Sequence, residues 1–218
     1  MDRMAVTFYT GAGSPFGWRV WLSLDHKLIP YTLEMLSFSK GDLGSPAYRA
    51  INPRAQVPSL LHDGFVLWES AAIVEYIDAV WPTPERPLFP ADPRGAAIVR
   101  RMVREADEYF AIRMEALVSL VLRTPEPERD ALAIARARTG LVAELATWER
   151  VLADVPFLAG DLSAADYTLY PLLALVTRME KREPRIDVAS AIGPGVRAWQ
   201  SRVETLPHFE GTYPSHWR

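Results

Sequence analysis

The chain has 218 residues, 49% of them hydrophobic, which is enough to bury one large core or two modest ones. Its 24 basic and 27 acidic residues give a formal net charge of -3, which argues against a nucleic-acid or anionic-membrane partner. It has no cysteine, which excludes disulfides, thiolate metal sites and a cysteine nucleophile. Any thiol chemistry must therefore use a thiol that a ligand brings.

Nothing in the sequence indicates a membrane span or a metal site. No apolar run reaches the ~18–20 residues of a membrane helix, and the apolar stretch within residues 1–10 is too short for a signal peptide. The histidines are scattered, and none has a partner at the i+4 spacing of a helical metal site. We therefore expect a soluble, cytoplasmic protein without a metal.

Roughly the first 80 residues mix strand and helix patterns. In chain order they predict a strand, a helix, a second strand, an irregular stretch, a two-stranded hairpin and a further helix. The elements fall at residues 5–9, 15–24, 31–36, 59–61, 65–68 and 70–80. Asp63-Gly64 is a strong turn signal between the last two strands, and Pro15 suits the first turn of a helix.

A proline-rich stretch then interrupts the regular patterns. Prolines at positions 82, 84, 87, 90 and 93 are too many for a helix or strand, so we predict a domain at 1–82, a linker at 83–93 and a second domain at 94–218. Apolar residues at helical spacing predict an all-helical second domain. The expected faces are Ile98, Met102, Ala106, Tyr109, Phe110 and Leu117; Leu141, Leu145, Trp148 and Leu152; Leu169, Leu172, Leu173 and Val176; and Val196, Trp199 and Val203.

Ser14 is the first candidate for chemistry. It follows a strand and a glycine turn and precedes Pro15, so its hydroxyl lies at the positive end of the next helix. A serine that caps a helix needs no further function. Helix N-termini also attract anions, so the two roles are compatible.

Two further signals flank the predicted hairpin. A cis bond at Val57-Pro58 would leave the backbone N–H and C=O of Val57 open to a ligand, although trans is far commoner for X–Pro bonds in general. Ser70 is a suitable N-cap residue, and the N-terminus of the helix that it begins would bind a carboxylate. The neighbouring Glu69 would pair with an ammonium group. Together they fit the head of an α-amino acid, and a cap beside a solvated acid is the alternative.

Ser163 and Asp166 form a capping-box pattern, and the apolar Leu162 precedes them. The pattern predicts a helix start and a role in folding rather than in chemistry.

In this order the segments resemble the cytosolic glutathione transferase superfamily over essentially the whole chain. They are SPFGWRV at 14–20, NPRAQVP at 52–58, ES at 69–70 and GDLSAAD at 160–166. The resemblance is closest to the serine-type classes, such as zeta, phi and tau. It implies a thioredoxin-like α/β N-terminal domain that holds glutathione, an all-α C-terminal domain that supplies most of the electrophile pocket, and a homodimer.

The resemblance also implies roles for individual residues. Ser14 takes the place of the catalytic serine that stabilises the glutathione thiolate, and Tyr9 is its nearest rival. Phe16 stands where zeta members often carry a cysteine, which excludes redox activities that depend on that cysteine. The glutathione contacts are the backbone of Val57 beside a cis Pro58, Glu69 and Ser70 at the γ-glutamyl head with Gln56 assisting, and Lys40 at the glycine carboxylate.

The function implied is conjugation of glutathione to a small hydrophobic electrophile. The electrophile pocket is assigned to Phe16, Tyr109 and Arg113, although the spacing of Tyr109 also fits a helix core. A zeta-like isomerase of the maleylacetoacetate type, or a dehalogenase, is the alternative enzyme, and glutathione is then a cofactor. A non-catalytic binding module on the same fold is the alternative outside enzymology.

Overall fold

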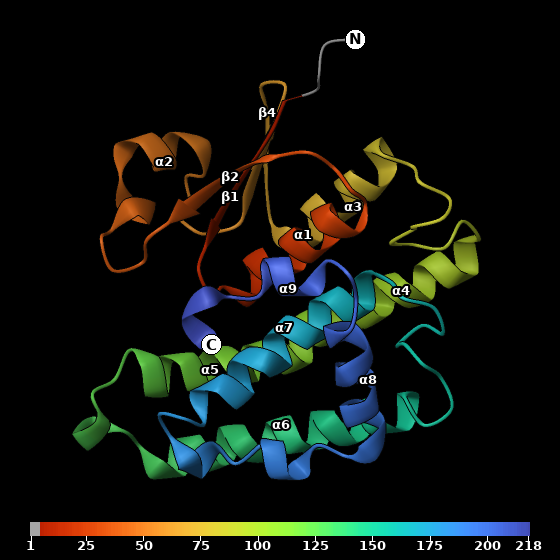
Figure 1. Ribbon diagram of the computed structural model, residues 1–218. Helices are drawn as coiled ribbons and strands as arrows, with labels where there is room; N and C mark the ends of the chain where they lie inside the picture. The colour runs from red at the N-terminus through yellow and green to blue at the C-terminus, as the bar shows by residue number, and fades with distance from the viewer. Residues whose placement is uncertain (1–4) are drawn as a thin grey trace. The chain divides into compact units, whose positions relative to one another are not determined.

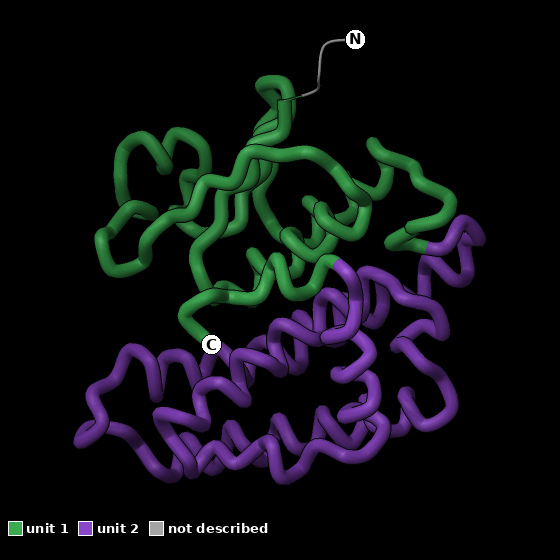
Figure 2. Tube along the Cα trace, viewed as in Figure 1, with its two compact units in different colours: residues 1–89, 208–218 green, residues 90–207 purple. Residues whose placement is uncertain are grey.

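The computed structural model describes residues 5–218. By its internal contacts the chain forms two compact units (Figure 2). Unit 1 runs to Phe89 and includes the final segment His208–Arg218, while unit 2 is Pro90–Pro207. The final segment therefore packs with the N-terminal unit rather than with the helices that precede it in sequence, because its aromatic side chains surround Trp18 of unit 1.

Unit 1 contains a mixed four-stranded sheet (Figure 1), in which the strand order is β2-β1-β3-β4. Strand β1 is parallel to β2 and antiparallel to β3, and β3 is antiparallel to β4. The elements are β1 (Val6–Gly11), α1 (Pro15–His26), β2 (Thr32–Leu36), η1 (Asp42–Gly44), α2 (Pro46–Ile51), β3 (Ser59–His62), β4 (Phe65–Trp68), α3 (Ser70–Val80), α9 (Phe209–Thr212) and η7 (Ser215–Trp217). The α/β order predicted from the sequence is confirmed.

The two faces of the sheet are covered by different helices. Phe8 of β1 packs edge-on against Trp21 of α1, with ring centroids 6.4 Å apart. The next residue, Tyr9, packs against Tyr48 of α2, with centroids 5.9 Å apart. Successive strand side chains point to opposite faces, so α1 and α2 lie on opposite sides of β1. Helix α3 packs beside α1.

Local sequence accounts for the hairpin and for one helix that periodicity missed. Asp63 and Gly64 both have positive φ, +48° and +85°, as a tight two-residue hairpin turn requires. The predicted hairpin is therefore confirmed. Helix α2 lies within the stretch expected to be irregular: Ser45 accepts a hydrogen bond from the Tyr48 N–H, and Pro46 begins the helix. Six residues are too few to show a helical repeat.

Unit 2 is helical, as predicted. Its elements are α4 (Pro93–Glu105), the π-helical η2 (Ala106–Phe110), α5 (Ala111–Leu117), the π-helical η3 (Val118–Leu122), η4 (Glu126–Glu128), α6 (Ala131–Val151), α7 (Ala164–Met179), η5 (Pro184–Ile186), η6 (Ala189–Ala191) and α8 (Pro194–Glu204). The residues predicted for the core of α6, α7 and α8 are buried. On the first long helical stretch, the prediction that Ile98 and Tyr109 lie on the buried face is wrong, because their side chains are 46% and 51% exposed.

The capping box before α7 is confirmed. Ser163 accepts from the first turn of α7, and its own N–H donates to Asp166 at 2.9 Å. The buried Asp166 carboxylate also accepts from the Leu158 N–H and from Nε1 of Trp199, at 2.9 and 2.8 Å. Burial raises the pKa of Asp166 to about 6 against the lowering effect of these donors. The motif thus ties α7 to α8, as its expected role in folding requires.

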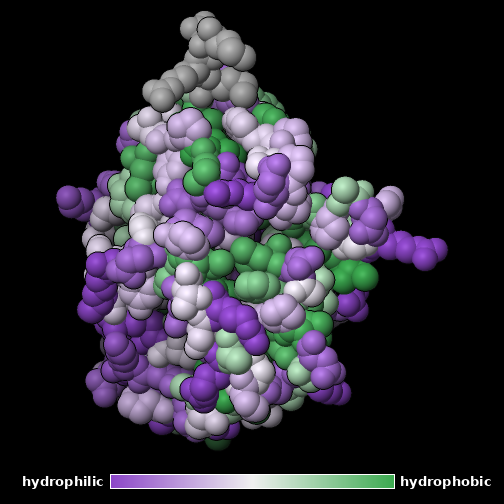
Figure 3. All heavy atoms as spheres, turned by 45° about the vertical axis from the view of Figure 1, so that its right-hand side comes forward, coloured by the Kyte–Doolittle hydropathy of each residue, from purple (hydrophilic) through white to green (hydrophobic). Residues whose placement is uncertain are grey.

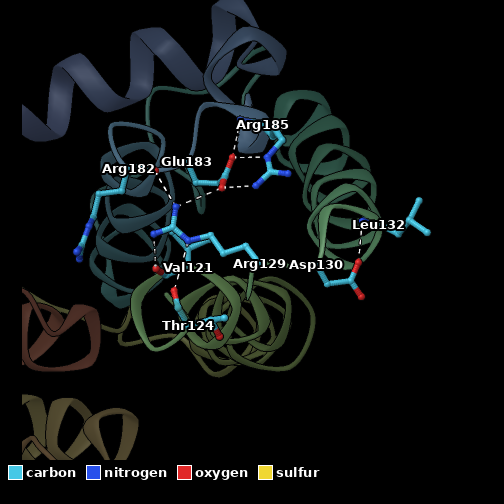
Figure 4. A network of polar contacts seen from close by, with 8 residues as sticks. All are labelled: Val121, Thr124, Arg129, Asp130, Leu132, Arg182, Glu183 and Arg185. Atoms are coloured by element: carbon cyan, nitrogen blue, oxygen red, sulfur yellow. Dashed lines mark hydrogen bonds and ion pairs between the residues drawn. The ribbon is translucent and has the colours of Figure 1, made fainter. Parts of the chain in front are cut away.

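A second buried polar network closes the opposite end of the unit 2 helices (Figure 4). Arg129 and Glu183 are almost fully buried, and Arg185 also pairs with Glu183 at 2.6 Å. The hydrogen bond from Arg185, helped by Arg129, lowers the pKa of Glu183 to about 2. The remaining donations from Arg129 go to the carbonyls of Val121, Thr124 and Arg182.

The surface is mixed in character, and Figure 3 shows polar and apolar side chains interspersed on one face. Large apolar side chains that are exposed include Leu28, Phe38, Ile112 and Leu132. Across residues 5–218, no helix combines the length and the apolar composition needed to cross a membrane.

Candidate active site

Strand register gathers the candidate residues at one end of the sheet. Tyr9 pairs with Ser59, and Ser59 pairs with Trp68. The residues that follow β1, precede β3 and follow β4 therefore meet at this end. They are Ser14, Val57-Pro58 and Glu69-Ser70, and the loop after β2 that carries Lys40 joins them because Gly11 pairs with Leu36.

Ser14 stands at the N-cap of α1. Its φ of -71° and ψ of 119° are extended, and its Oγ accepts a hydrogen bond from the Gly17 N–H at 3.2 Å. The side chain is largely buried. A hydroxyl that accepts one hydrogen bond keeps its own proton for donation. The capping role is therefore confirmed, and the geometry leaves this hydroxyl able to serve an anion as well.

Thr10 and Gly17 support Ser14 from within unit 1. A Cβ at Gly17 would lie 2.0 Å from Oγ1 of Thr10, a separation that real side chains do not tolerate. Thr10 is buried near the end of strand β1. Glycine at 17 thus lets the first turn of α1 sit against the strand, with its N–H directed at Ser14.

Tyr9, the rival of Ser14, points elsewhere. Its ring lies on the α2 side of β1, against Tyr48, whereas Ser14 begins the helix that covers the other side. The Tyr48 hydroxyl donates to the carbonyl of Gln56 at 2.7 Å. The two tyrosines therefore belong to the support of the Gln56–Pro58 turn rather than to the start of α1.

The Val57–Pro58 peptide bond is cis, as the family resemblance implies. The turn before it is fixed by Asn52, which is buried and donates from Nδ2 to the Gln56 carbonyl at 2.8 Å. Within residues 5–218 the backbone of Val57 makes no backbone hydrogen bond. The Gln56 side chain is exposed. This turn presents an open backbone N–H and C=O at the end of the sheet.

The junction of β4 and α3 differs in detail from the prediction. The sequence suggests Ser70 as N-cap, but the cap position is Glu69, and Ser70 is the first helical residue. Glu69 is exposed, makes no capping hydrogen bond and has φ of +70°, an uncommon value for a residue other than glycine. The first N–H groups of α3 are therefore uncapped by this side chain, which suits them to an anion.

The remaining predicted residues are dispersed. Lys40 is exposed in the loop after β2, where its N–H donates to Oγ of Ser37. Phe16 lies under the guanidinium of Arg19, 5.7 Å from ring centroid to Cζ. Tyr109 and Arg113 belong to unit 2.

Arg113 is turned toward its own helix and toward α6. Its Nη1 donates to the carbonyl of Tyr109 and lies 3.7 Å from Glu144. Its side chain also covers Gly140 of α6. The structure thus places Arg113 in the packing of α5 on α6, whereas Tyr109 is half exposed.

Sequence reasoning missed the final segment as a neighbour of Ser14. Nε2 of His216 and Nε1 of Trp217 each lie 3.1 Å from the point that a Cβ on Gly13 would occupy. The signal that could have found it is the spacing of Phe209, Tyr213 and Trp217, because aromatic residues recur there every fourth position.

Comparison with known proteins agrees with this geometry. Residues 13–80 match the glutathione S-transferase N-terminal domain, and residues 131–199 match the glutathione S-transferase C-terminal domain. Glutathione S-transferase A of Pleuronectes platessa is 31% identical over 97% of this chain and 92% of its own length. Maleylacetoacetate isomerase of Rattus norvegicus is 30% identical over 79% of this chain and 78% of its own.

The fold is shared with solved structures of the same group. A theta class glutathione S-transferase from Xanthomonas axonopodis pv. citri, solved with glutathione bound, has a TM-score of 0.84 and 29% identity, covering 99% of this chain and 100% of that one. The predicted fold class, a thioredoxin-like α/β domain followed by an all-α domain, is confirmed. Relatives of this kind are enzymes, and the chain belongs to the glutathione S-transferase superfamily.

Proposed function

We propose that the chain conjugates the thiolate of glutathione to small hydrophobic electrophiles, and that Ser14 stabilises the thiolate. The observation that carries the proposal is the Ser14 hydroxyl at the start of α1, largely buried and accepting the Gly17 N–H. That hydrogen bond leaves the hydroxyl proton available to a sulfur anion. The positive end of α1 favours the same charge.

The rest of this sheet end supports glutathione as the ligand. The open backbone of Val57 beside cis Pro58 fits the cysteinyl peptide. The uncapped start of α3 at Ser70 fits the γ-glutamyl carboxylate, and the exposed Glu69 fits its ammonium group. The exposed side chains of Gln56 and Lys40 complete the proposed contacts, with Lys40 at the glycine carboxylate. The relative that was solved with glutathione bound adds support.

The energies are sufficient without a general base. A free thiol has a pKa of ~8.5, so only a few per cent is thiolate at neutral pH. Lowering that pKa by ~2 units requires about 2.7 kcal/mol of preferential stabilisation of the thiolate. A hydroxyl that donates to an anion contributes ~1.5–3 kcal/mol, and the helix terminus adds ~0.3–1 kcal/mol. Ser14 acts here as a hydrogen-bond donor to sulfur and not as a nucleophile.

The test is the pH–rate profile of Ser14→Ala with a chloronitrobenzene substrate. We expect the variant to fold and to bind glutathione, but to lose about tenfold or more of the rate at neutral pH. The midpoint of its profile should rise toward that of the free thiol, ~8.5. A profile identical to that of the parent would refute the role of Ser14.

A second candidate is glutathione-dependent cis–trans isomerisation, in which glutathione is a cofactor. The maleylacetoacetate isomerase relative favours it. A panel of a chloronitrobenzene, an organic peroxide and a maleyl diketo acid separates the two activities. Preferential turnover of the diketo acid would make isomerisation the main function. The assignment of Phe16, Tyr109 and Arg113 to the electrophile stays a prediction.

We also propose that the chain acts as a homodimer, which the family resemblance implies. Light scattering during gel filtration should give twice the chain mass of 24.5 kDa. A monomeric mass at micromolar concentration would contradict the proposal.

A further inference from the structure

The final segment is anchored on α1 by one buried indole. Nε1 of Trp18 donates to Oγ1 of Thr212 at 2.9 Å, and Thr212 itself is buried. The Trp18 ring also meets the rings of Phe209, Tyr213 and Trp217, with centroids 5.6–5.8 Å apart. A hydrogen bond inside an aromatic cluster gives this segment a defined position.

The anchored segment brings two rings against the loop that precedes Ser14. A Cβ at Gly13 would lie 3.0 Å from Cε1 of His216 and 3.1 Å from Nε1 of Trp217. Gly13 also has φ of +80°, which favours glycine for a second reason. The space that a side chain at position 13 would need is thus occupied by the imidazole of His216 and the indole of Trp217.

The loop between β1 and α1 is short. It contains the exposed Ala12, then Gly13 and the N-cap residue Ser14. Gly11, which ends β1, is the last residue that the sheet fixes, through its pairing with Leu36. A single turn hydrogen bond, from the Ser14 N–H to the Gly11 carbonyl at 3.0 Å, spans it. Glycine residues retain much conformational freedom. The rings of His216 and Trp217, packed against Gly13, therefore limit how far the Ser14 backbone can rotate.

We propose that His216 and Trp217 are positioning residues for Ser14. They fix the Gly13 peptide on one side while the Gly17 N–H holds the Ser14 hydroxyl on the other. The hydroxyl then keeps one direction toward the sulfur. This inference rests on the proposed function, because it concerns how Ser14 meets the thiol. A preorganised anion site differs from a mobile one in that its hydrogen-bond donor is held in a fixed direction.

The experiment measures the pH midpoint of thiolate formation in the glutathione complex, by ultraviolet absorbance, together with the glutathione Kd. The variants are His216→Ala, Trp217→Ala and Trp217→Phe, with Ser14→Ala as the reference. We expect His216→Ala and Trp217→Ala to raise the midpoint by about half a pH unit or more while the Kd changes less than threefold (about 0.7 kcal/mol). Trp217→Phe should restore part of the shift, because it keeps a ring beside Gly13.

Phe209→Ala is the matched control. Phe209 contacts Trp18 and Tyr213 and is not among the closest atoms to Gly13, so its loss should lower thermal stability and leave the midpoint unchanged. A shift in Ser14→Ala with none in His216→Ala or Trp217→Ala overturns the positioning role alone. An equal shift in Phe209→Ala overturns it too, because general loosening would then explain the effect. No shift in Ser14→Ala overturns the proposed function, and the positioning role with it. His216 is exposed, so His216→Ala tests the idea even if Trp217→Ala does not fold.

Discussion

Nζ of Lys27 lies 2.7 Å from Oδ1 of Asp78, and this ion pair joins the end of α1 to α3. The Lys27 side chain is fully buried, and that of Asp78 is 17% exposed. Asp78 also accepts from the backbone N–H groups of Leu88 and Phe89, at 3.0 and 3.2 Å. One carboxylate therefore fixes two helices and the chain that leaves unit 1.

Asp78→Ala should destabilise the protein by about 3 kcal/mol or more, because it leaves a buried ammonium and two N–H groups without their acceptor. Lys27→Met should cost less, since Asp78 keeps its two backbone donors and the methionine fills the space of the lysine stem. Urea unfolding of both variants at neutral pH measures the difference. Equal losses in the two variants would contradict this ranking.

His26, the last residue of α1, packs against His208 of the final segment, with ring centroids 5.5 Å apart, and this pair predicts acid sensitivity. Burial, and then the neighbouring cations His208, Arg86 and Lys27, lower the pKa of His26 to about 4. An unfolded histidine titrates near ~6.5, so between these values the unfolded chain binds more protons and stability falls as the pH decreases. The shift of His208 has the same sign and the same leading cause.

Urea midpoints at pH 7, 6 and 5 should therefore fall in the parent and fall less in His26→Gln. Asp166, whose pKa is raised to about 6, also titrates in this range with the opposite sign, but it does so equally in both proteins. The difference between the parent and His26→Gln therefore isolates His26. If both proteins lose stability in parallel, His26 is not the group responsible.

Gly17→Ala tests the contact beneath Ser14. The added methyl would meet Oγ1 of Thr10 at 2.0 Å, and overpacking of this kind costs ~1–3 kcal/mol. Because the Gly17 N–H holds the Ser14 hydroxyl, we expect a loss of activity of about tenfold or more per folded molecule. Gly44→Ala is the control, since a Cβ at Gly44 meets nothing within 4 Å. Normal turnover in Gly17→Ala would show that the contact between Gly17 and Ser14 does not affect catalysis.

Glu69→Gly should separate stability from binding. Glycine adopts the φ of +70° at position 69 without steric cost, so relief of strain of ~1–3 kcal/mol offsets the greater freedom of a glycine in the unfolded chain. We expect unchanged or greater thermal stability and weaker glutathione affinity, with the maximal rate affected less than the Kd. If a calorimetric titration shows that this variant binds glutathione as tightly as the parent, Glu69 is not part of the proposed site.

Much of unit 1 could be predicted from local sequence. The strand at the N-terminus, the proline that begins α1 and the Asp63-Gly64 turn each carry their own signal, and each appears in the structure as expected. Helix α2 did not, because it is shorter than two helical turns and its cap at Ser45 is an isolated serine among other turn residues.

The site was harder to predict than the fold, because sheet register creates it. Val57, Glu69 and Ser14 become neighbours only once β3 pairs with both β1 and β4. The sequence suggests Ser70 as the N-cap of α3, whereas the structure has Glu69 there. The difference arises from the positive φ of Glu69, which a glutamate in the sequence does not predict. Long-range packing decided the environment of Arg113, whose partner Glu144 lies on α6.

Unit 1 is assembled from both ends of the sequence, and this affects how the protein can be made. During synthesis the sheet and its first helices emerge early, yet the indole of Trp18 lacks Thr212 as an acceptor until residues 208–218 have left the ribosome. The whole of Pro90–Pro207 is translated in between. The nascent N-terminal unit therefore carries an uncovered aromatic surface until residues 208–218 emerge. Because His216 and Trp217 lie against Gly13, a purification tag fused after Arg218 would be attached next to the loop that holds Ser14.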